Sequence, residues 1–244
     1  MNNNEYPEQI EAYVRTESDE PDGPYCPIEP RWGYLYEDGF FVDEEKFLPG
    51  DYFVNPGFLI ILLGGINYDH PLEKAAEAVF ASIHSLFAAC GVPVHFERMR
   101  TFAELQKSIE HNRESYSHVI LIGHGSKHGI SFIDRNELAS GSELASAFEC
   151  FEGCDPIQVI SLCCHSGCEA LSSQLSKAEM VSEVIAPKDT FHIQWAVHFI
   201  TGYLLEFFVN SQSVAEAVRK SAVYSSKTPM CVWKDGVLYE SCIV

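Results

Sequence analysis

Basic residues are scarce in this sequence. The 244-residue chain has 16 lysines and arginines against 35 aspartates and glutamates, which gives a formal net charge of −19. Residues 1–57 contribute 14 acidic and 3 basic residues, a net −11, and the remainder contributes 21 and 13, a net −8. Such a negative field repels nucleic acids and anionic membrane surfaces, and it favours basic partners. The charge therefore argues against a nucleic-acid-binding role.

A secretion signal and a long hydrophobic run are also missing. The chain opens with MNNNE, which has neither a basic start nor an apolar core. The most apolar segment, residues 195–209, is short for a membrane span and contains His198 and Glu206, so we interpret it as a buried helix. The nine cysteines are an odd number, and without a signal peptide they indicate reduced thiols. We therefore expect a cytoplasmic protein that does not enter the membrane.

No internal repeat or low-complexity tract divides the chain, but its composition changes near residue 57. Residues 1 to about 24 are polar, acidic and interrupted by proline and glycine, which favours a disordered or extended arm. Aromatic residues follow, and Tyr34–Phe41 predicts a hairpin with an Asp-Gly turn. We expect residues 1–57 to form an acidic, partly disordered arm and appendage, and residues 58–244 to form the main domain.

In the main domain, short apolar runs alternate with segments of helical spacing. Short β-branched runs bounded by glycine or proline are typical of buried parallel strands. Such runs occupy residues 58–63, 92–96, 119–122, 157–160 and 181–186. We expect helices over residues 71–89, 101–111, 142–151 (with Ser142 as the N-cap), 170–176, 190–209 and 213–224, and a final hairpin over residues 232–239. This alternation predicts an α/β fold, a three-layer α/β/α sandwich around a mostly parallel sheet.

Two of these strands end at residues that can perform chemistry. The run 119–122 leads into Gly123-His124-Gly125, and the run 157–160 leads into Ser161-Leu162-Cys163. Parallel strands present their carboxyl ends at one edge of the sheet, where open α/β sheets bind ligands. An imidazole beside a thiol favours the thiolate and accepts its proton, which activates the sulfur as a nucleophile. We interpret His124 and Cys163 as a catalytic pair, with the amides of Gly125 and Cys163 as donors to an oxyanion.

Other interpretations of the same residues stay open. A Gly-His-Gly sequence at a strand end is often only a tight turn, and a buried cysteine often serves as a small hydrophobe. Cys164 is a second possible nucleophile, because adjacent residues of an extended segment point to opposite sides. A zinc site is a further alternative, although the cysteine spacing fits no standard pair of knuckles. Its ligands would come from Cys150, Cys154, Cys163, Cys164, His165 and Cys168.

The order of these motifs resembles that of the caspase-like cysteine peptidases, and most closely their CHAT branch of caspase and separase relatives. The similarity covers residues 58–224: a strand running into His-Gly at 121–125, a strand running into Ser-x-Cys at 159–163, a strand and turn at 184–189, and an Ala-Glu-Ala-x-Arg helix at 213–220. The Ser-x-Cys match implies that Cys163, not Cys164, is the nucleophile. Ala186 stands where the family has a tryptophan before Pro187, and Cys164 and His165 are unusual in the turn.

The resemblance implies a caspase-like fold and a cysteine endopeptidase that works through a thioester acyl-enzyme, without a cofactor or metal. It also implies an effector of a bacterial defence or cell-death system, activated by a sensor or regulatory protein. Asp189 matches a family position that selects arginine or lysine before the scissile bond, although it is also a good N-cap for the helix expected from Thr190. The alternatives are an inactive scaffold that binds proteins and a thiol acyltransferase or amidase.

Overall fold

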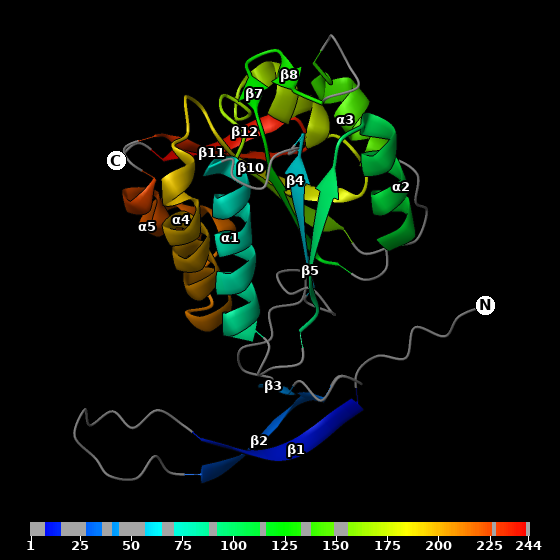
Figure 1. The fold of residues 1–244 in the computed structure, drawn as a ribbon. Helices are drawn as coiled ribbons and strands as arrows, with labels where there is room; N and C mark the ends of the chain where they lie inside the picture. Colours follow the sequence, from blue (N-terminus) through cyan, green and yellow to red (C-terminus); the bar gives the residue numbers. More distant parts are fainter. Residues whose placement is uncertain are drawn as a thin grey trace. The chain divides into compact units, whose positions relative to one another are not determined.

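The structure is a computed structural model. It describes residues 8–15, 28–35, 41–43, 57–64, 71–87, 92–112, 116–132, 138–148, 156–225 and 228–242 (Figure 1). The chain divides into two compact units, residues 1–54 and residues 55–244.

The first unit contains a three-stranded antiparallel sheet in the order β1-β2-β3. Its strands are β1 (Glu8–Arg15), β2 (Ile28–Leu35) and β3 (Phe41–Asp43). Strand β1 lies where we expected a disordered or extended arm, and it pairs with β2 along its whole length. Strands β2 and β3 pair as the predicted hairpin, whose Asp-Gly turn lies outside the described residues.

The second unit is built on a seven-stranded sheet in the order β12-β11-β10-β9-β6-β4-β5. Its parallel strands are β4 (Phe58–Leu63), β5 (Val94–Met99), β6 (His118–Ile122), β9 (Ile157–Ser161) and β10 (Val181–Pro187). The antiparallel strands β11 (Met230–Lys234) and β12 (Val237–Cys242) complete one edge. The mostly parallel sheet is therefore confirmed.

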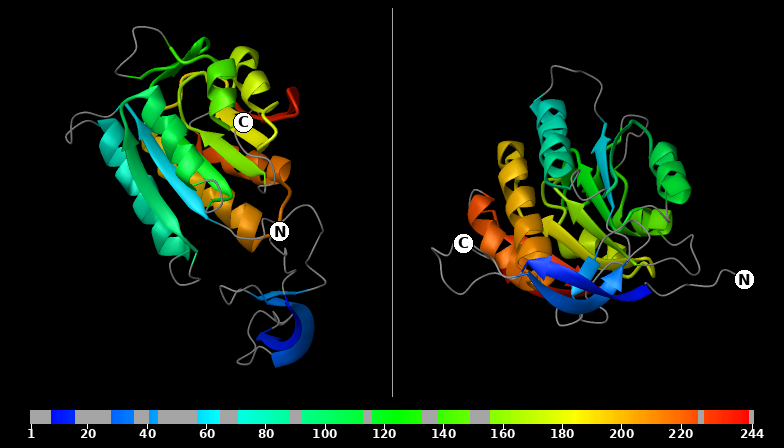
Figure 2. Two further views of the ribbon diagram at one scale, coloured as in Figure 1. Left: turned by 90° about the vertical axis from the view of Figure 1, so that its right-hand side faces the viewer. Right: turned by 90° about the horizontal axis from the view of Figure 1, so that it is seen from below.

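Helices cover both faces of this sheet. One face carries α1 (Pro71–Phe87), α4 (Ala196–Leu204) and α5 (Val214–Ser221), and the other carries α2 (Phe102–Asn112), α3 (Gly141–Phe148) and the π-helix η3 (Glu169–Ser173) (Figures 1 and 2). Every residue of β4, β6 and β9 is buried. Burial on both faces explains why these strands are mostly apolar, with His118, Gln158 and Ser161 as buried polar exceptions. The predicted three-layer α/β/α architecture is confirmed.

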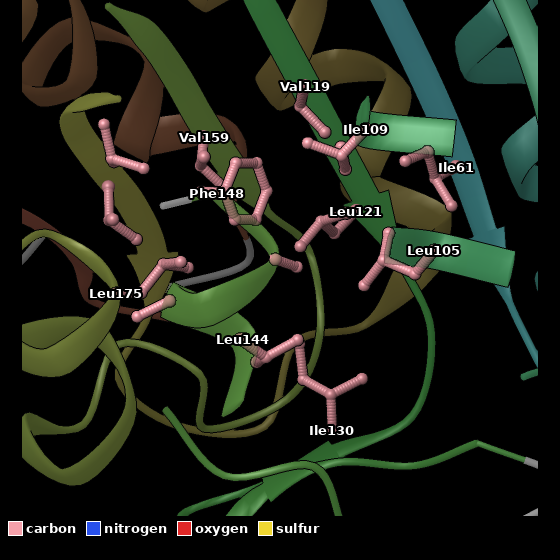
Figure 3. Close-up of a cluster of buried hydrophobic side chains, with 14 of the residues drawn as sticks. Ile61, Leu105, Ile109, Val119, Leu121, Ile130, Leu144, Phe148, Val159 and Leu175 are labelled. Atoms are coloured by element: carbon pink, nitrogen blue, oxygen red, sulfur yellow. The ribbon is translucent and has the colours of Figure 1, made fainter. Parts of the chain in front are cut away.

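The core consists of two clusters, one on each face of the sheet. Figure 3 shows the cluster beneath α2 and α3, in which side chains from both helices pack on the strands. Leu105 and Ile109 come from α2, Leu144 and Phe148 come from α3, and the strands contribute Ile61, Val119, Leu121 and Val159. The opposite cluster joins the alternate residues of the same strands to α1, α4 and α5.

The helix starts follow local side-chain capping, with one correction. The capping box predicted for α2 is present: the Glu104 amide donates to the Thr101 hydroxyl over 3.1 Å, and the Thr101 amide donates back to the Glu104 carboxylate over 3.1 Å. Helix α3 is capped by Ser140, not by Ser142 as we expected. The Glu143 amide donates to the Ser140 hydroxyl over 3.3 Å, and the Ser140 amide donates to the Glu143 carboxylate over 2.8 Å.

The helix expected over residues 190–209 is shorter and divided. It begins with a 3₁₀ turn, η4 (Ile193–Trp195), continues as α4 and ends in a π-helix, η5 (Leu205–Val209). It does not begin at residue 190, because the residues around that position are bonded to the segment before β11. The Lys188 amide donates to the Pro229 carbonyl, and the Thr190 carbonyl accepts from the Thr228 hydroxyl. Among the described residues, no helix is long and apolar enough to cross a membrane.

The strand order decides which loops meet. Strand β4 has β5 on one side and β6 on the other, so the chain reverses its direction of winding between β4 and β6. Ligands of open α/β sheets bind outside the carboxyl ends of strands at such a reversal. Strand β9 lies directly beside β6, with Leu121 opposite Ser161. The residues that follow β6 and β9 therefore lie side by side at the carboxyl ends of the parallel strands.

Candidate active site

The chain after β6 forms a tight turn that presents His124. The side chain of His124 is exposed, and its carbonyl accepts a hydrogen bond from the Ser131 amide over 2.9 Å. Next comes a small hairpin of β7 (Gly125–Ser126) and β8 (Gly129–Ile130). The Ser131 bond makes Gly125 and Ile130 a non-hydrogen-bonded pair of this hairpin, so the Gly125 amide faces away from β8.

Gly125 packs directly on the cysteine pair that follows β9. A Cβ atom at this position would lie 2.6 Å from the Cys164 carbonyl oxygen and 2.9 Å from the Cys163 Cβ. Both distances are shorter than van der Waals contact, so only glycine fits. The structure thus brings the His-Gly turn and the two cysteines together, as expected from two neighbouring parallel strands.

Cys163 points into the core. Its side chain is 0% exposed and belongs to the cluster beneath α2 and α3. The thiol donates to the Leu121 carbonyl over 3.9 Å, and the Cys163 amide donates to the Ser161 hydroxyl over 3.3 Å. Burial raises the pKa of this thiol to about 12. In this structure the Cys163 thiol is enclosed and its amide is already bonded, and the catalytic and oxyanion-donor roles of Cys163 stay predictions.

Cys164 points to the opposite side and is partly exposed. Its sulfur lies against the backbone of Phe191: the thiol donates to the Phe191 carbonyl over 3.6 Å and accepts from the Phe191 amide over 3.4 Å. Phe191 itself is buried in the cluster beneath α1 and α4. Of the two adjacent cysteines, Cys164 is the one that solvent reaches.

The turn after the cysteines is held between β9 and β10. Ser166 donates through its hydroxyl to the Cys163 carbonyl over 2.7 Å, and the Gly167 amide donates to Pro187 over 2.8 Å. The indole of Trp233, on β11, donates to the Gly167 carbonyl over 3.0 Å. No local sequence pattern predicts this contact, because Trp233 and Gly167 lie 66 residues apart in the chain.

Asp189 lies in the segment that follows β10 and is exposed. Its carbonyl accepts a hydrogen bond from the His165 amide over 2.9 Å, which places Asp189 beside the turn that carries Cys164. The capping alternative for Asp189 is wrong, because the helix begins at Ile193 with His192 in the N-cap position. Asp189 is thus at the same sheet edge as the candidate pair without serving as a cap.

The described part of the chain offers no metal centre. Within it, no group of three or more histidine, cysteine, aspartate or glutamate side chains could hold a metal ion. Of the residues considered for zinc, Cys150 and Cys154 lie outside the described residues, and the Cys168 thiol donates to the Lys188 carbonyl over 3.6 Å. The five described cysteines are free thiols.

Comparisons with known proteins give a likeness of fold. No family model matches the sequence, and no curated protein matches it. Among solved structures, the chain is similar to the inactive zymogen of a C11 protease from Parabacteroides distasonis, with a TM-score of 0.51 and 14% identity over 78% of this chain. This chain spans 64% of the length of that protease. The C-terminal domain of a coenzyme A biosynthesis bifunctional protein matches more weakly, with a TM-score of 0.36 and 6% identity over 78% of this chain and 90% of that domain. The likeness to the protease shows that this chain has a caspase-like α/β fold.

Proposed function

We propose that the protein is a cysteine endopeptidase in which Cys164 is the nucleophile and His124 is its general base. The observation that carries this proposal is the close approach of Gly125 to the backbone of the cysteine pair, because it brings the turn of the exposed residue His124 beside the partly exposed residue Cys164 at the carboxyl ends of β6 and β9. The caspase-like fold shared with a C11 protease supports the same reaction class.

Cys164 takes the place of Cys163 in this proposal for two reasons. A nucleophilic sulfur must reach the substrate, and Cys164 is partly exposed whereas Cys163 is enclosed in the core. A nucleophilic sulfur must also ionise, and burial raises the pKa of Cys163 to about 12. The Ser-x-Cys resemblance favoured Cys163 from spacing alone, and spacing does not distinguish which of two adjacent side chains faces the core.

The reaction then follows the chemistry of a thiol acyl transfer. His124 accepts the Cys164 proton, the thiolate attacks the scissile carbonyl carbon, and His124 returns the proton to the departing amine. Water then hydrolyses the thioester, which restores the thiol. The Gly125 amide faces away from its hairpin partner, and with the Cys164 amide it would donate to the tetrahedral oxyanion. The residues need no cofactor for these steps.

Substrate preference and control are the finer parts of the proposal. The exposed carboxylate of Asp189 beside the Cys164 turn suits a substrate with arginine or lysine before the scissile bond. The net charge of −19 suits a basic regulatory or sensor protein as partner. Membership of the CHAT branch and a role as effector in bacterial defence or cell death are supported only by the motif resemblance.

A proteome-wide cleavage experiment tests the proposal. Extracts of host cells are incubated with the wild type, Cys164→Ala, Cys163→Ala and His124→Ala, and new peptide termini are identified by mass spectrometry. We expect termini from the wild type and from Cys163→Ala, and none from the other two variants. Thermal melting of all four proteins checks that each is folded.

The outcomes separate the alternative functions. Cleavage by Cys164→Ala together with loss of cleavage in a folded Cys163→Ala would return the nucleophile to Cys163. If the wild type cleaves nothing, labelling with a small thioester acyl donor distinguishes an acyltransferase from an inactive scaffold. Transfer of the acyl group to an added amine, dependent on Cys164, would indicate an acyltransferase. The absence of both labelling and transfer would indicate an inactive scaffold.

A further inference from the structure

Strand β12 is an outermost strand of the seven-stranded sheet, so it has a hydrogen-bonded neighbour, β11, on one side only. Three consecutive residues of this strand are large, apolar and exposed: Val237 is 65% exposed, Leu238 43% and Tyr239 68%. An edge strand with exposed apolar side chains offers its outer backbone N–H and C=O groups for pairing with another chain. Such an edge requires either protection or a partner.

The strand at the opposite edge, β5, shows how an edge of this sheet is protected. Two of its residues carry charged side chains that are bonded to the neighbouring helices: Glu97 accepts a hydrogen bond from the Ser108 hydroxyl over 2.6 Å, and Arg98 donates to the Glu73 carboxylate over 2.7 Å. Charged side chains on an edge strand discourage pairing with another chain. The three exposed residues of β12 include no charged residue, so β12 lacks this protection.

A β-bulge interrupts β12 at Tyr239. Trp233 of β11 pairs with Leu238 and Val232 pairs with Glu240, so Tyr239 has no partner on β11. A bulge can protect an edge strand by bending it, but it also redirects the side chain of the added residue. Here the added residue is the most exposed of the three apolar residues. The bulge therefore presents an aromatic ring at this edge.

Two cations lie beside β12, and both are held in ion pairs within the chain. Lys234 is the last residue of β11, and its ammonium group lies 3.3 Å from the Glu183 carboxylate. Arg219 lies on α5, which contacts β12, and its guanidinium donates to the Glu216 carboxylate over 2.8 Å. These two cations are therefore engaged by Glu183 and Glu216.

Two carboxylates at the same edge remain without such a partner. Asp235 is exposed in the turn between β11 and β12, and Glu240 is a partly exposed residue of β12. Neither forms an ion pair with another described residue. A second copy of the chain would bring the same carboxylates and the same net charge of −19, whereas lysine or arginine side chains would complement them. The charge therefore favours a basic segment of another protein over a second copy.

We propose that β12 is a docking edge for an extended segment of a basic partner protein, which adds a strand to the sheet and alternates apolar residues with lysine or arginine. Backbone hydrogen bonds to β12 would hold the segment, its apolar residues would cover residues 237–239, and its basic residues would meet Asp235 and Glu240. The inference shares with the proposed function only the basic character of the partner. It requires no peptidase activity, because β10 and β11 separate β12 from β9.

A synthetic strand tests this docking edge. The probe is a fluorescein-labelled peptide of alternating valine and lysine, about eight residues long, which is an ordinary strand length. The control peptide has the same composition but places all its valines before all its lysines, so it has the same charge without an apolar face. Fluorescence anisotropy measures the binding of each peptide to the full chain. Hydrogen exchange, followed by mass spectrometry, reports the protection of the β12 amides.

Four variants separate the docking edge from the rest of the surface. Val237→Thr and Tyr239→Thr, combined in one protein, remove apolar surface but keep residues that favour a strand. Val209→Thr is the matched control, because Val209 on η5 is 68% exposed and lies outside the sheet. Asp189→Asn identifies a peptide that binds in the proposed substrate site instead. Melting temperatures show that each variant is folded.

We expect the alternating peptide to bind at least about tenfold more tightly than the control peptide and to slow hydrogen exchange in β12, because only the alternating peptide covers the apolar residues. The combined Val237→Thr and Tyr239→Thr variant should bind it at least about tenfold more weakly. Val209→Thr and Asp189→Asn should bind it as the wild type does. Added salt should weaken the binding, because it screens the contacts between lysine and carboxylate.

Three results would overturn the inference. Equal binding of the two peptides, or no binding of the alternating one, would mean that β12 does not recognise an added strand. Binding that is lost in Asp189→Asn and kept in the combined variant would place the peptide in the proposed substrate site. A dimer in sedimentation that the combined variant dissociates would assign the edge to a second copy. The proposed peptidase activity is judged separately, by the cleavage of peptides and its dependence on Cys164.

Discussion

His118 makes the folded protein sensitive to acid. His118 is the first residue of β6, whereas His124 follows the last residue of this strand, and the side chain of His118 is 0% exposed. The ring lies 5.0 Å from the ring of Phe58 and 5.2 Å from that of Phe208, and Nδ1 shares a hydrogen bond of 2.7 Å with the Ser117 hydroxyl. Burial lowers the pKa of His118 to about 3. The folded protein therefore keeps this ring neutral in mild acid.

The size of the effect follows from linkage. In the unfolded chain the ring takes up a proton below about pH 6.5, whereas in the folded chain it does so only near pH 3. The unfolded state binds more protons between these values, so stability is unaffected above pH 6.5 and falls as the pH decreases through this window. At pH 5, about 1.5 units below the unfolded pKa, the loss is about 2 kcal/mol at about 1.4 kcal/mol per unit.

Urea unfolding at pH 7.5 and pH 5.0 measures this loss. We expect the wild type to lose about 2 kcal/mol more between the two pH values than His118→Phe, which keeps an aromatic ring but cannot titrate. The comparison cancels the titration of the acidic residues, which both proteins share. His84→Asn is the control for replacing a histidine, because His84 is exposed on α1 and lies outside the core. An equal pH dependence of His118→Phe and the wild type would refute the reasoning.

Other substitutions test the site and the core. Gly125→Ala should lower the rate of peptide cleavage at least about tenfold and lower the free energy of unfolding in urea by about 1–3 kcal/mol, because the added methyl group must displace the Cys164 carbonyl 2.6 Å away. Cleavage at the wild-type rate would contradict the close contact. Asp189→Asn should lower kcat/KM for peptides with arginine or lysine before the scissile bond while leaving Tm unchanged, and an unaltered peptide preference would remove Asp189 from the substrate site. Tyr203→Phe should cost about 1–3 kcal/mol in urea, because the Tyr203 hydroxyl donates to the Gln158 side-chain oxygen over 2.6 Å and both residues are fully buried. Adding Gln158→Leu should recover part of this cost, and a double variant less stable than Tyr203→Phe would contradict the assignment.

The sequence alone predicted the elements whose signals are local. Strands β4, β6 and β9 were evident because a strand buried on both faces is apolar at most of its positions. The C-terminal hairpin was evident because Asp235 and Gly236 suit a two-residue turn, and both have positive φ angles in the structure, 51° and 78°. The meeting of the β6 and β9 ends also followed from the sequence, since successive parallel strands are usually neighbours.

Which of the two cysteines, Cys163 or Cys164, is buried could not be predicted from the sequence. Alternation in an extended chain predicts that the two thiols face opposite sides, and that much is independent of the fold. Which side is closed depends on α2 and α3, which cover one face of the sheet and enclose Cys163 in their cluster. The residues next to the cysteines in the sequence do not predict this packing.

The remaining differences have the same origin in contacts between distant residues. Strand β1 forms because Glu8–Arg15 pairs with β2, and the pairing supplies hydrogen bonds that its polar composition does not reveal. The helix predicted from residue 190 begins only at Ile193, because Thr190 is bonded to Thr228 and Phe191 is bonded to Cys164. Local patterns determined where strands and helices can form. Hydrogen bonds and packing between segments far apart in the chain decided where these elements end and which of the two cysteines is buried.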